Sequence, residues 1–279
     1  MGLALETILG YNNNLTGSTT FDALTAGTGG TFTVRSFVDG SNAYLEDVWA
    51  SNDDSIFQLS IKSPRLHDQV KGILFAGTNL STTNEQVFTP QPLMPGLMTQ
   101  VLYSTDVLSV TVNGTAADVF NAAFNIRYEN LGGINARLYG WETIHPLIVN
   151  WVGILTQPVP SSTAGQWGAT YVLNSGDNRL KANTDYALLG YTSSRTVTAV
   201  AINGTDTGNL NIGGPGGYSA SVTGNFFADQ SRLYGIPHIP VINSNNAGST
   251  VVQIADILTS GTPNVTWIFA QLSQRLGNP

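Results

Sequence analysis

Two pairs of segments in this chain follow one template: YLEDVW at residues 44–49 with IFQLSI at 56–61, and YALLGY at 186–191 with VTAVAI at 197–202. The two pairs begin at Tyr44 and Tyr186, so the offset between them is 142 residues. Their β-branched and aromatic residues are typical of β-strands. Because the offset keeps similar residue types aligned across both segments, it indicates one β-unit used twice in tandem.

The same offset continues along the chain. Further matches are Pro95, Leu97, Thr99 and Val101 with Pro237, Ile239, Val241 and Asn243, and Ser109–Val112 with Val251–Ile254. Each unit then ends in another β-like segment, Phe124–Tyr128 in the first and Val265–Phe269 in the second. The similarity is one of pattern, and it extends over most of both units.

Short strand-like segments separated by Gly, Asn, Asp, Ser and Pro clusters fill both units, and helical periodicity is nearly absent. This pattern is typical of a sandwich or barrel. We therefore predict an all-β protein of two tandem eight-stranded jelly-roll β-sandwiches or barrels, with a short N-terminal helix. The predicted divisions are an N-terminal arm at 1–20, a first jelly roll at 21–130, a connection at 131–160 and a second jelly roll at 161–279. The longest loops are expected at 76–96 and 204–225.

The apolar residues of Leu3–Leu9 are predicted to form the N-terminal helix, which Gly10 would end. This segment lacks the cationic start, the long apolar stretch and the cleavage site of a signal peptide. No apolar run reaches the roughly 18 residues that a membrane-spanning helix needs, so we expect no membrane span.

Charged residues make up only 10% of the 279 residues, against about 25% in ordinary soluble domains. One explanation is that much of the surface is buried against neighbouring copies, because charged residues are depleted in interface cores. The other is an extracellular β-protein or lectin. The net charge is −7 and no Lys/Arg-rich run is present, which argues against a basic arm that packages nucleic acid. We therefore expect no direct sequence-specific nucleic-acid binding.

Few residues are suited to metal or cofactor binding, and we predict neither a metal site nor a cofactor. The chain has no cysteine, and its histidines, His67, His145 and His238, have no second histidine at metal-ligand spacing. The acidic turns Asp53-Asp54 and Asp177-Asn178 match no calcium-loop spacing. His67 next to Asp68 is better explained as a solvated loop pair than as an acid/base pair.

The residues that could serve catalysis do not combine into a site either. Adjacent Glu46 and Asp47 are expected to point to opposite faces of a strand, whereas a glycosidase needs two carboxylates that face one cleft. Glu142 beside Trp141 resembles part of a sugar subsite, although a linker carboxylate beside a packed indole is the simpler interpretation. Gly213–Gly217 lacks the Lys-Ser/Thr of a phosphate loop and is expected to be an exposed, flexible loop. We predict no catalytic residue and no enzyme activity.

Taken together, the tandem β-units, the N-terminal helix and the missing active site resemble a known family. The chain is similar to the double jelly-roll major capsid proteins of tailless icosahedral viruses, in their compact bacterial-virus form. The resemblance covers nearly the whole chain and is architectural. It rests on the helix Leu3–Leu9, a first unit from about Phe21 to Tyr128, a connection around Trp141–Pro160 and a second unit closing at Thr250–Leu272.

The resemblance implies a structural protein of the virion that self-assembles in the host cytoplasm. Three chains would form a homotrimer whose six barrels give a pseudo-hexagonal footprint. Its partners would be neighbouring capsid trimers, with minor capsid or penton proteins as further candidates. The N-terminal helix would face an internal membrane if the virion has one, and loops 76–96 and 204–225 would decorate the outside.

Two hypotheses from other classes stay open. The first is a carbohydrate-binding β-sandwich module or a viral fibre/adhesin, for which Trp49, Trp141, Trp167 and the Asn/Thr-rich loops are the motivation. The second is a hydrolase with Glu142 as its acid.

Overall fold

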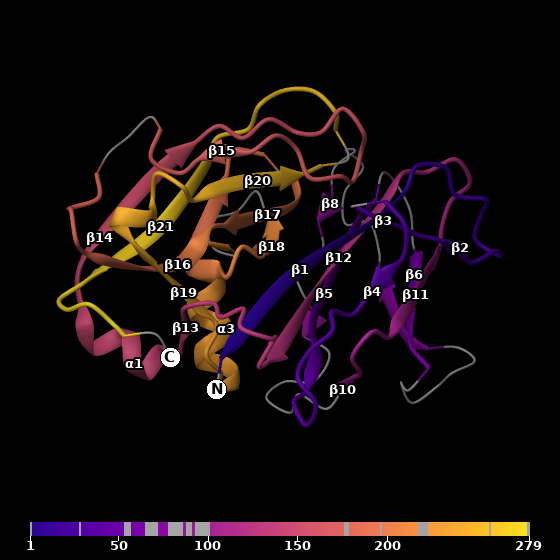
Figure 1. Cartoon of the computed structure of the whole chain (residues 1–279). Helices are drawn as coiled ribbons and strands as arrows, with labels where there is room; N and C mark the ends of the chain where they lie inside the picture. The colour runs from indigo at the N-terminus through magenta and orange to yellow at the C-terminus, as the bar shows by residue number, and fades with distance from the viewer. Residues whose placement is uncertain are drawn as a thin grey trace.

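The computed structural model describes residues 2–27, 29–52, 57–64, 72–77, 86–87, 91–92, 101–175, 179–195, 197–216, 223–256 and 258–277. Within them the chain forms antiparallel β-sheets with few helices, which confirms the predicted all-β class. Strands from the first half of the sequence lie on one side of the molecule, strands from the second half lie on the other, and β1 runs between them (Figure 1).

In the described part of residues 3–129, every regular element is a strand, and four strands are long enough to dominate the sheets. The strands are β1 (Leu3–Asn12), β2 (Asp22–Ala23), β3 (Thr25–Ala26), β4 (Phe32–Thr33), β5 (Ala43–Asn52), β6 (Phe57–Lys62), β7 (Ile73–Gly77), β8 (Gln86–Val87), β9 (Gln91–Pro92), β10 (Val101–Leu102), β11 (Val107–Asn113) and β12 (Phe120–Glu129).

The rest of the chain adds short helices to a second set of strands. Its elements are β13 (Leu138–Tyr139), α1 (Trp141–Ile144), η1 (His145–Leu147), β14 (Ile148–Thr156), β15 (Tyr171–Val172), β16 (Asp185–Ser193), β17 (Val197–Asn203), η2 (Thr205–Thr207), β18 (Ile212–Gly216), α3 (Phe226–Tyr234), β19 (Ile239–Asn243), η3 (Ser244–Asn246), β20 (Val251–Ala255) and β21 (Val265–Leu272).

The two halves share one strand order. One sheet of the first half contains β10-β5-β12-β1, and its counterpart in the second half contains β19-β16-β21-β14. The other sheets are β2-β11-β6-β7 and β15-β20-β17-β18. Apart from the short strands β3, β4, β8, β9 and β13, each half therefore places its sixth, third, eighth and first strands in one sheet. Its second, seventh, fourth and fifth strands form the other, and the sequence repeat aligns β5 with β16 and β6 with β17.

Each half also carries a β-bulge at the same place. In β5, Glu46 and Asp47 together lie opposite Asn125 of β12, because the register shifts between Leu45 and Val48. In β16, Leu189 is the extra residue opposite β21. Asp47 and Leu189 are 142 residues apart, the offset of the sequence repeat. A bulge is a defined structural feature, so its recurrence supports duplication of the whole unit.

The predicted N-terminal helix is wrong, because Leu3–Asn12 forms strand β1 and pairs with β12 along its full length. The strand is buried on both faces: Ala4 lies in the first hydrophobic core and Leu5 in the second. A strand of this kind has no simple alternation of apolar and polar residues, and a short apolar run does not distinguish it from a helix. Long-range pairing decided the conformation.

Two predicted loop regions also contain regular structure. The predicted connection at 131–160 includes β14, which pairs with β21 at one edge of a sheet. The predicted exposed loop at 204–225 includes β18, whose residues Ile212–Gly216 are all buried. A Cβ on Gly213 would overlap the carbonyl oxygen of Val200. The glycines therefore allow β18 to lie close against β17, and the run is not an exposed loop.

The loop predicted at 76–96 falls largely outside the described residues. Its described parts are the end of β7 and the strands β8 and β9, both of which pair with β5.

Three hydrophobic clusters fill the interior. One lies between the sheets of the first half, and another lies between those of the second. A third cluster, which we call the junction cluster, joins the halves and contains Leu9, Trp49, Ala123, Ala199 and Ala255. The halves are thus packed together through side chains from five different strands.

Candidate functional site

The residues that the sequence offered for chemistry are scattered. Glu142 lies exposed in the first turn of α1, where the indole of Trp141 contacts the His145 ring at a centroid distance of 5.1 Å. Asp53-Asp54, Asp177-Asn178 and His67 lie outside the described residues. His238 is the exception, because it lies buried beside charged groups of the first half.

A buried row of polar side chains on β12 faces the second half. The side chains of β12 alternate, with Phe120, Phe124 and Tyr128 in the first core. The intervening side chains reach across the junction: Asn121 Nδ2 donates to Thr198 Oγ1 at 3.2 Å, and Arg127 Nη1 donates to the carbonyl oxygen of Pro237 at 2.6 Å. We call Asn121, Asn125 and Arg127, with the groups that they contact, the polar seam.

Asn125 is the centre of the seam. It accepts a hydrogen bond from Thr7 Oγ1 at 2.7 Å, and the same Thr7 oxygen accepts from the Gly213 amide at 2.8 Å. Asn125 Nδ2 donates to Asp47 Oδ2 at 3.1 Å and to the carbonyl oxygen of Gly213 at 3.4 Å. Beside them, Trp49 Nε1 donates to the carbonyl oxygen of Thr198 at 2.9 Å. Each of these groups would be costly to bury without its partner.

The bulge in β5 brings both of its carboxylates to the seam. Arg127 donates from Nε and Nη2 to the two oxygens of Glu46, and Asp47 contacts Asn125. The expectation that Glu46 and Asp47 point to opposite faces is therefore wrong. Strict alternation fails because two residues of β5 occupy the space opposite one residue of β12.

The electrostatic setting separates these two carboxylates. Burial alone would raise the pKa of Glu46, but Arg127 and His238 outweigh it and hold the pKa at about 2. For Asp47, burial dominates and raises the pKa above its ordinary value. His238 Nδ1 lies 3.2 Å from Arg127 Nη2. Since arginine can only donate, His238 accepts at Nδ1 in this arrangement.

The seam is closed to solvent. Arg127 is 1% exposed, Asp47 is 2% exposed, and His238 is fully buried. A substrate at the surface cannot reach these groups, so the arrangement acts to hold the two halves in one relative position. Among the described residues, no group of three or more His, Cys, Asp or Glu side chains is placed to hold a metal ion.

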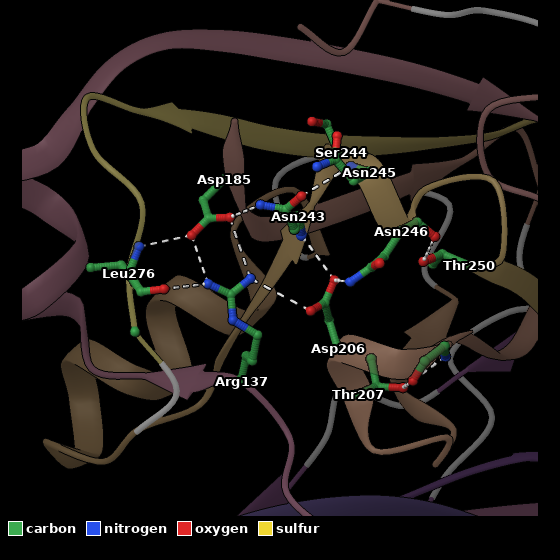
Figure 2. Close-up of polar contacts among 12 residues, drawn as sticks. Arg137, Asp185, Asp206, Thr207, Asn243, Ser244, Asn245, Asn246, Thr250 and Leu276 are labelled. Carbon is green, nitrogen blue, oxygen red and sulfur yellow. Dashed lines mark hydrogen bonds and ion pairs between the residues drawn. The ribbon is translucent and has the colours of Figure 1, made fainter. Parts of the chain in front are cut away.

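A second polar cluster fixes the C-terminal segment to the second half (Figure 2). Asp185 lies between Arg137, Asn243 and the backbone of Leu276, with Arg137 Nη2 at 2.6 Å, Asn243 Nδ2 at 2.7 Å and the Leu276 amide at 2.8 Å. Burial would raise the pKa of Asp185, but these donors outweigh it and lower the pKa. Asp206 forms a further ion pair with Arg137 at 3.5 Å.

Neither cluster was apparent from the residue pattern. On β12, the polar residues at alternate positions suggest an ordinary strand with one face in solvent, and Arg127 looks like a surface residue. Its only distinguishing signal is that the other members of the row are small or uncharged, namely Asn121, Ala123 and Asn125. Asp185 and Asp206 likewise read as turn residues.

The outer surface of β14 carries a cluster of exposed apolar side chains. Of the ten large hydrophobic residues that are exposed in the described part of the chain, four lie between positions 149 and 159: Val149, Trp151, Leu155 and Val159. Trp151 is 56% exposed. Across the ladder from Gly153 lies Ile268 of β21, which is partly exposed and extends the apolar surface. We call these five apolar residues the β14 patch.

The tryptophans proposed for carbohydrate binding have different environments. Trp49 is 2% exposed and cannot present its ring to a ligand. Trp141 is partly buried, with the Arg232 guanidinium carbon 5.4 Å from its ring centroid. Trp167 is also partly buried and packs against the junction cluster.

No family model matches this chain, and no curated protein matches it at a significant level. Within the described residues, none of the helices has both the length and the apolar character to cross a membrane.

Proposed function

We propose that this protein is the structural major capsid protein of a tailless icosahedral virus, built as two tandem jelly rolls. The observation that carries the proposal is the strand order. In a jelly roll, two four-stranded sheets pair the first strand with the eighth, the third with the eighth and with the sixth, and the second with the seventh. Both halves of this chain have these neighbours, and a jelly-roll sandwich is a common architecture of capsid proteins.

The polar seam supports a rigid two-unit block. Arg127, Asn125 and Trp49 of the first half are bonded to the second half through buried contacts. Fixed contacts of this kind keep the two units from rotating against each other. In the proposed homotrimer, three such blocks present six similar units and give the pseudo-hexagonal footprint that tiles a capsid surface.

A difference between the two halves supports assembly through β14. In the first half, the outer edge of β1 is covered: the Leu3 carbonyl accepts from Ala136, the Thr7 amide donates to Asn211, and the Leu9 carbonyl accepts from Gly27. In the second half, β14 occupies the equivalent place, and within the described residues no strand pairs with its outer edge. It also lies on the side of the molecule away from the first half (Figure 1).

An open edge strand that also exposes apolar side chains is a site for pairing with another chain. The proposed occupant is a second copy of this protein, because each copy has this edge open while its own equivalent edge is closed. The low charge of the chain agrees with a surface that is partly covered by neighbours. Neighbouring trimers, and minor capsid or penton proteins, are the proposed partners.

The proposal differs in one respect from what the family resemblance implied. The N-terminal segment is the central strand β1, which is largely buried between the halves. An inward-facing N-terminal helix that contacts an internal membrane is therefore not part of it.

The test is the assembly state of the purified protein. Light scattering at micromolar concentration is expected to show trimers or larger species, and electron microscopy of the same sample is expected to show sheets or shells with hexagonal spacing. A protein that stays monomeric under these conditions would contradict the proposal.

A further inference from the structure

A pocket of about 480 Å³ lies between the two halves. One wall is formed by Glu6–Leu9 of β1 and by residues 31–36, and the other by Trp167 and residues 209–211. Small-molecule sites typically have volumes of about 300–1,000 Å³ and often form where domains meet. The volume and the position of this pocket fit both criteria, and the groups that line it indicate the class of ligand.

The apolar part of the lining consists of Leu9, Phe32, Val34 and Leu210, which are buried, and of the Trp167 indole. Trp167 is held by packing against the junction cluster and by a backbone bridge to Ala255. Its partly exposed ring therefore has a fixed orientation. A fixed aromatic surface of this kind suits a ligand with a flat apolar face.

The polar part of the lining is dominated by amides. Asn203 Nδ2 donates to Asn211 Oδ1 at 2.9 Å and to the Asn209 carbonyl oxygen at 3.3 Å. These bonds orient the two side chains and leave Asn203 Oδ1 as an acceptor and Asn211 Nδ2 as a donor. The exposed hydroxyl groups of Thr31 and Thr33 lie 3.1 Å apart on the opposite wall.

The charges in the pocket cancel. Arg35 donates to both oxygens of Glu6, from Nε at 2.7 Å and from Nη2 at 2.6 Å. Such a fork-like pair satisfies the carboxylate and occupies two faces of the guanidinium. An ionic ligand would have to break this pair, whereas a neutral ligand with hydroxyl groups would not.

We propose that this pocket binds a neutral saccharide. The sugar ring packs its apolar C–H face on the Trp167 indole, while its hydroxyl groups bond with the amides of Asn203, Asn209 and Asn211. The site is separate from the β14 patch, so saccharide binding does not depend on the proposed assembly function, and each can fail without the other.

The probes are the methyl glycosides of glucose, galactose, mannose and N-acetylglucosamine, with glucuronic acid as the charged comparison. Binding to the full chain is measured by titration calorimetry and by saturation-transfer NMR. At least one methyl glycoside is expected to bind saturably with one site per chain, and more tightly than glucuronic acid. Tighter binding of glucuronic acid, or no saturable binding of any methyl glycoside, would overturn the proposal.

Two variants connect binding to this pocket. Trp167→Ala is expected to weaken binding by about tenfold or more, because it removes the stacking surface. Since it also loosens the junction cluster, Asn209→Gly provides a second test. Asn209 has a φ of 58°, which glycine adopts without strain, and its loss is expected to weaken binding by about three- to tenfold.

The matched control is Asn183→Gly, another asparagine with positive φ (55°), which lies outside the pocket. It should bind with the affinity of the unmodified protein. Unchanged affinity in both Trp167→Ala and Asn209→Gly would place the saccharide elsewhere and overturn the proposal.

Discussion

Asp47 in β5 and Leu189 in β16 lie at matching β-bulges, 142 residues apart, but they face opposite kinds of environment. Asp47 accepts a hydrogen bond from Asn125 in the polar seam, whereas Leu189 belongs to the hydrophobic core of the second half. The repeated backbone feature is thus used twice. In the first half it brings two carboxylates to the junction, and in the second it adds an apolar side chain to a core.

Replacing Arg127 by Leu should destabilise the protein by about 3–5 kcal/mol, because Glu46 would stay buried without its partner. The measurement is the free energy of unfolding in urea. The matched control is Arg35→Leu, which breaks an arginine–glutamate pair whose arginine is 46% exposed and should cost no more than about 1 kcal/mol. Equal effects of the two changes would show that the seam does not hold the halves together.

Stability should fall with acid in a range set by Glu46. Its pKa is about 2 in the folded protein, against an ordinary value of 4.5. A lowered pKa contributes stability that is complete above the ordinary value and is lost as the pH falls from about 4.5 to 2. Urea unfolding at a series of pH values should show this loss in the unmodified protein and a shallower one in Glu46→Gln. Curves with the same slope would contradict the prediction.

Asp47→Asn supplies a comparison with the opposite sign. Burial raises the pKa of Asp47, so the ionised carboxylate destabilises the fold at neutral pH, and this cost disappears as the pH falls through the raised value. The amide oxygen of the variant can still accept from Asn125, and the side chain carries no charge. The variant should therefore be more stable than the unmodified protein at neutral pH in urea unfolding, with a gain that shrinks in acid. A variant that is less stable at neutral pH would show that the ionised carboxylate stabilises the seam.

Trp151→Asp should weaken self-assembly, since it places a charge in the β14 patch. The concentration at which trimers or larger species form should rise by about tenfold or more, while the circular dichroism spectrum stays unchanged. Leu233→Asp is the control, because Leu233 is 71% exposed on α3, outside the patch. If both variants assemble as the unmodified protein does, β14 is not the contact surface.

Gly213→Ala should destabilise the fold by about 1–3 kcal/mol, because the added Cβ overlaps the Val200 carbonyl and forces β18 away from β17. Thermal or urea unfolding measures the change. Gly248→Ala is the control, since a Cβ there meets no atom within 4 Å. A cost below about 0.5 kcal/mol at Gly213 would mean that β18 can shift to make room.

Several strands were predictable because their signal is local. The β-branched and aromatic segments at Val197 and Val265 correspond to β17 and β21, and the inward orientation expected for Trp267 agrees with its full burial. The candidate site was not predictable to the same extent. Arg127 has its partners at Glu46, Pro237 and His238, which are 81 to 111 positions away in the chain.

The sequence by itself determined the all-β class and the repeat, since short β-rich segments and the 142-residue offset depend only on local residue pattern. Only the tertiary structure decided that Leu3–Asn12 is a strand, that Ile212–Gly216 is buried, and that, within the described residues, β14 keeps a free edge while β1 does not. The physical reason is that burial and pairing at these places come from elements distant in the chain. The polar row on β12 has the pattern of a solvent-facing surface, and it became the centre of the molecule because the second half packs against it.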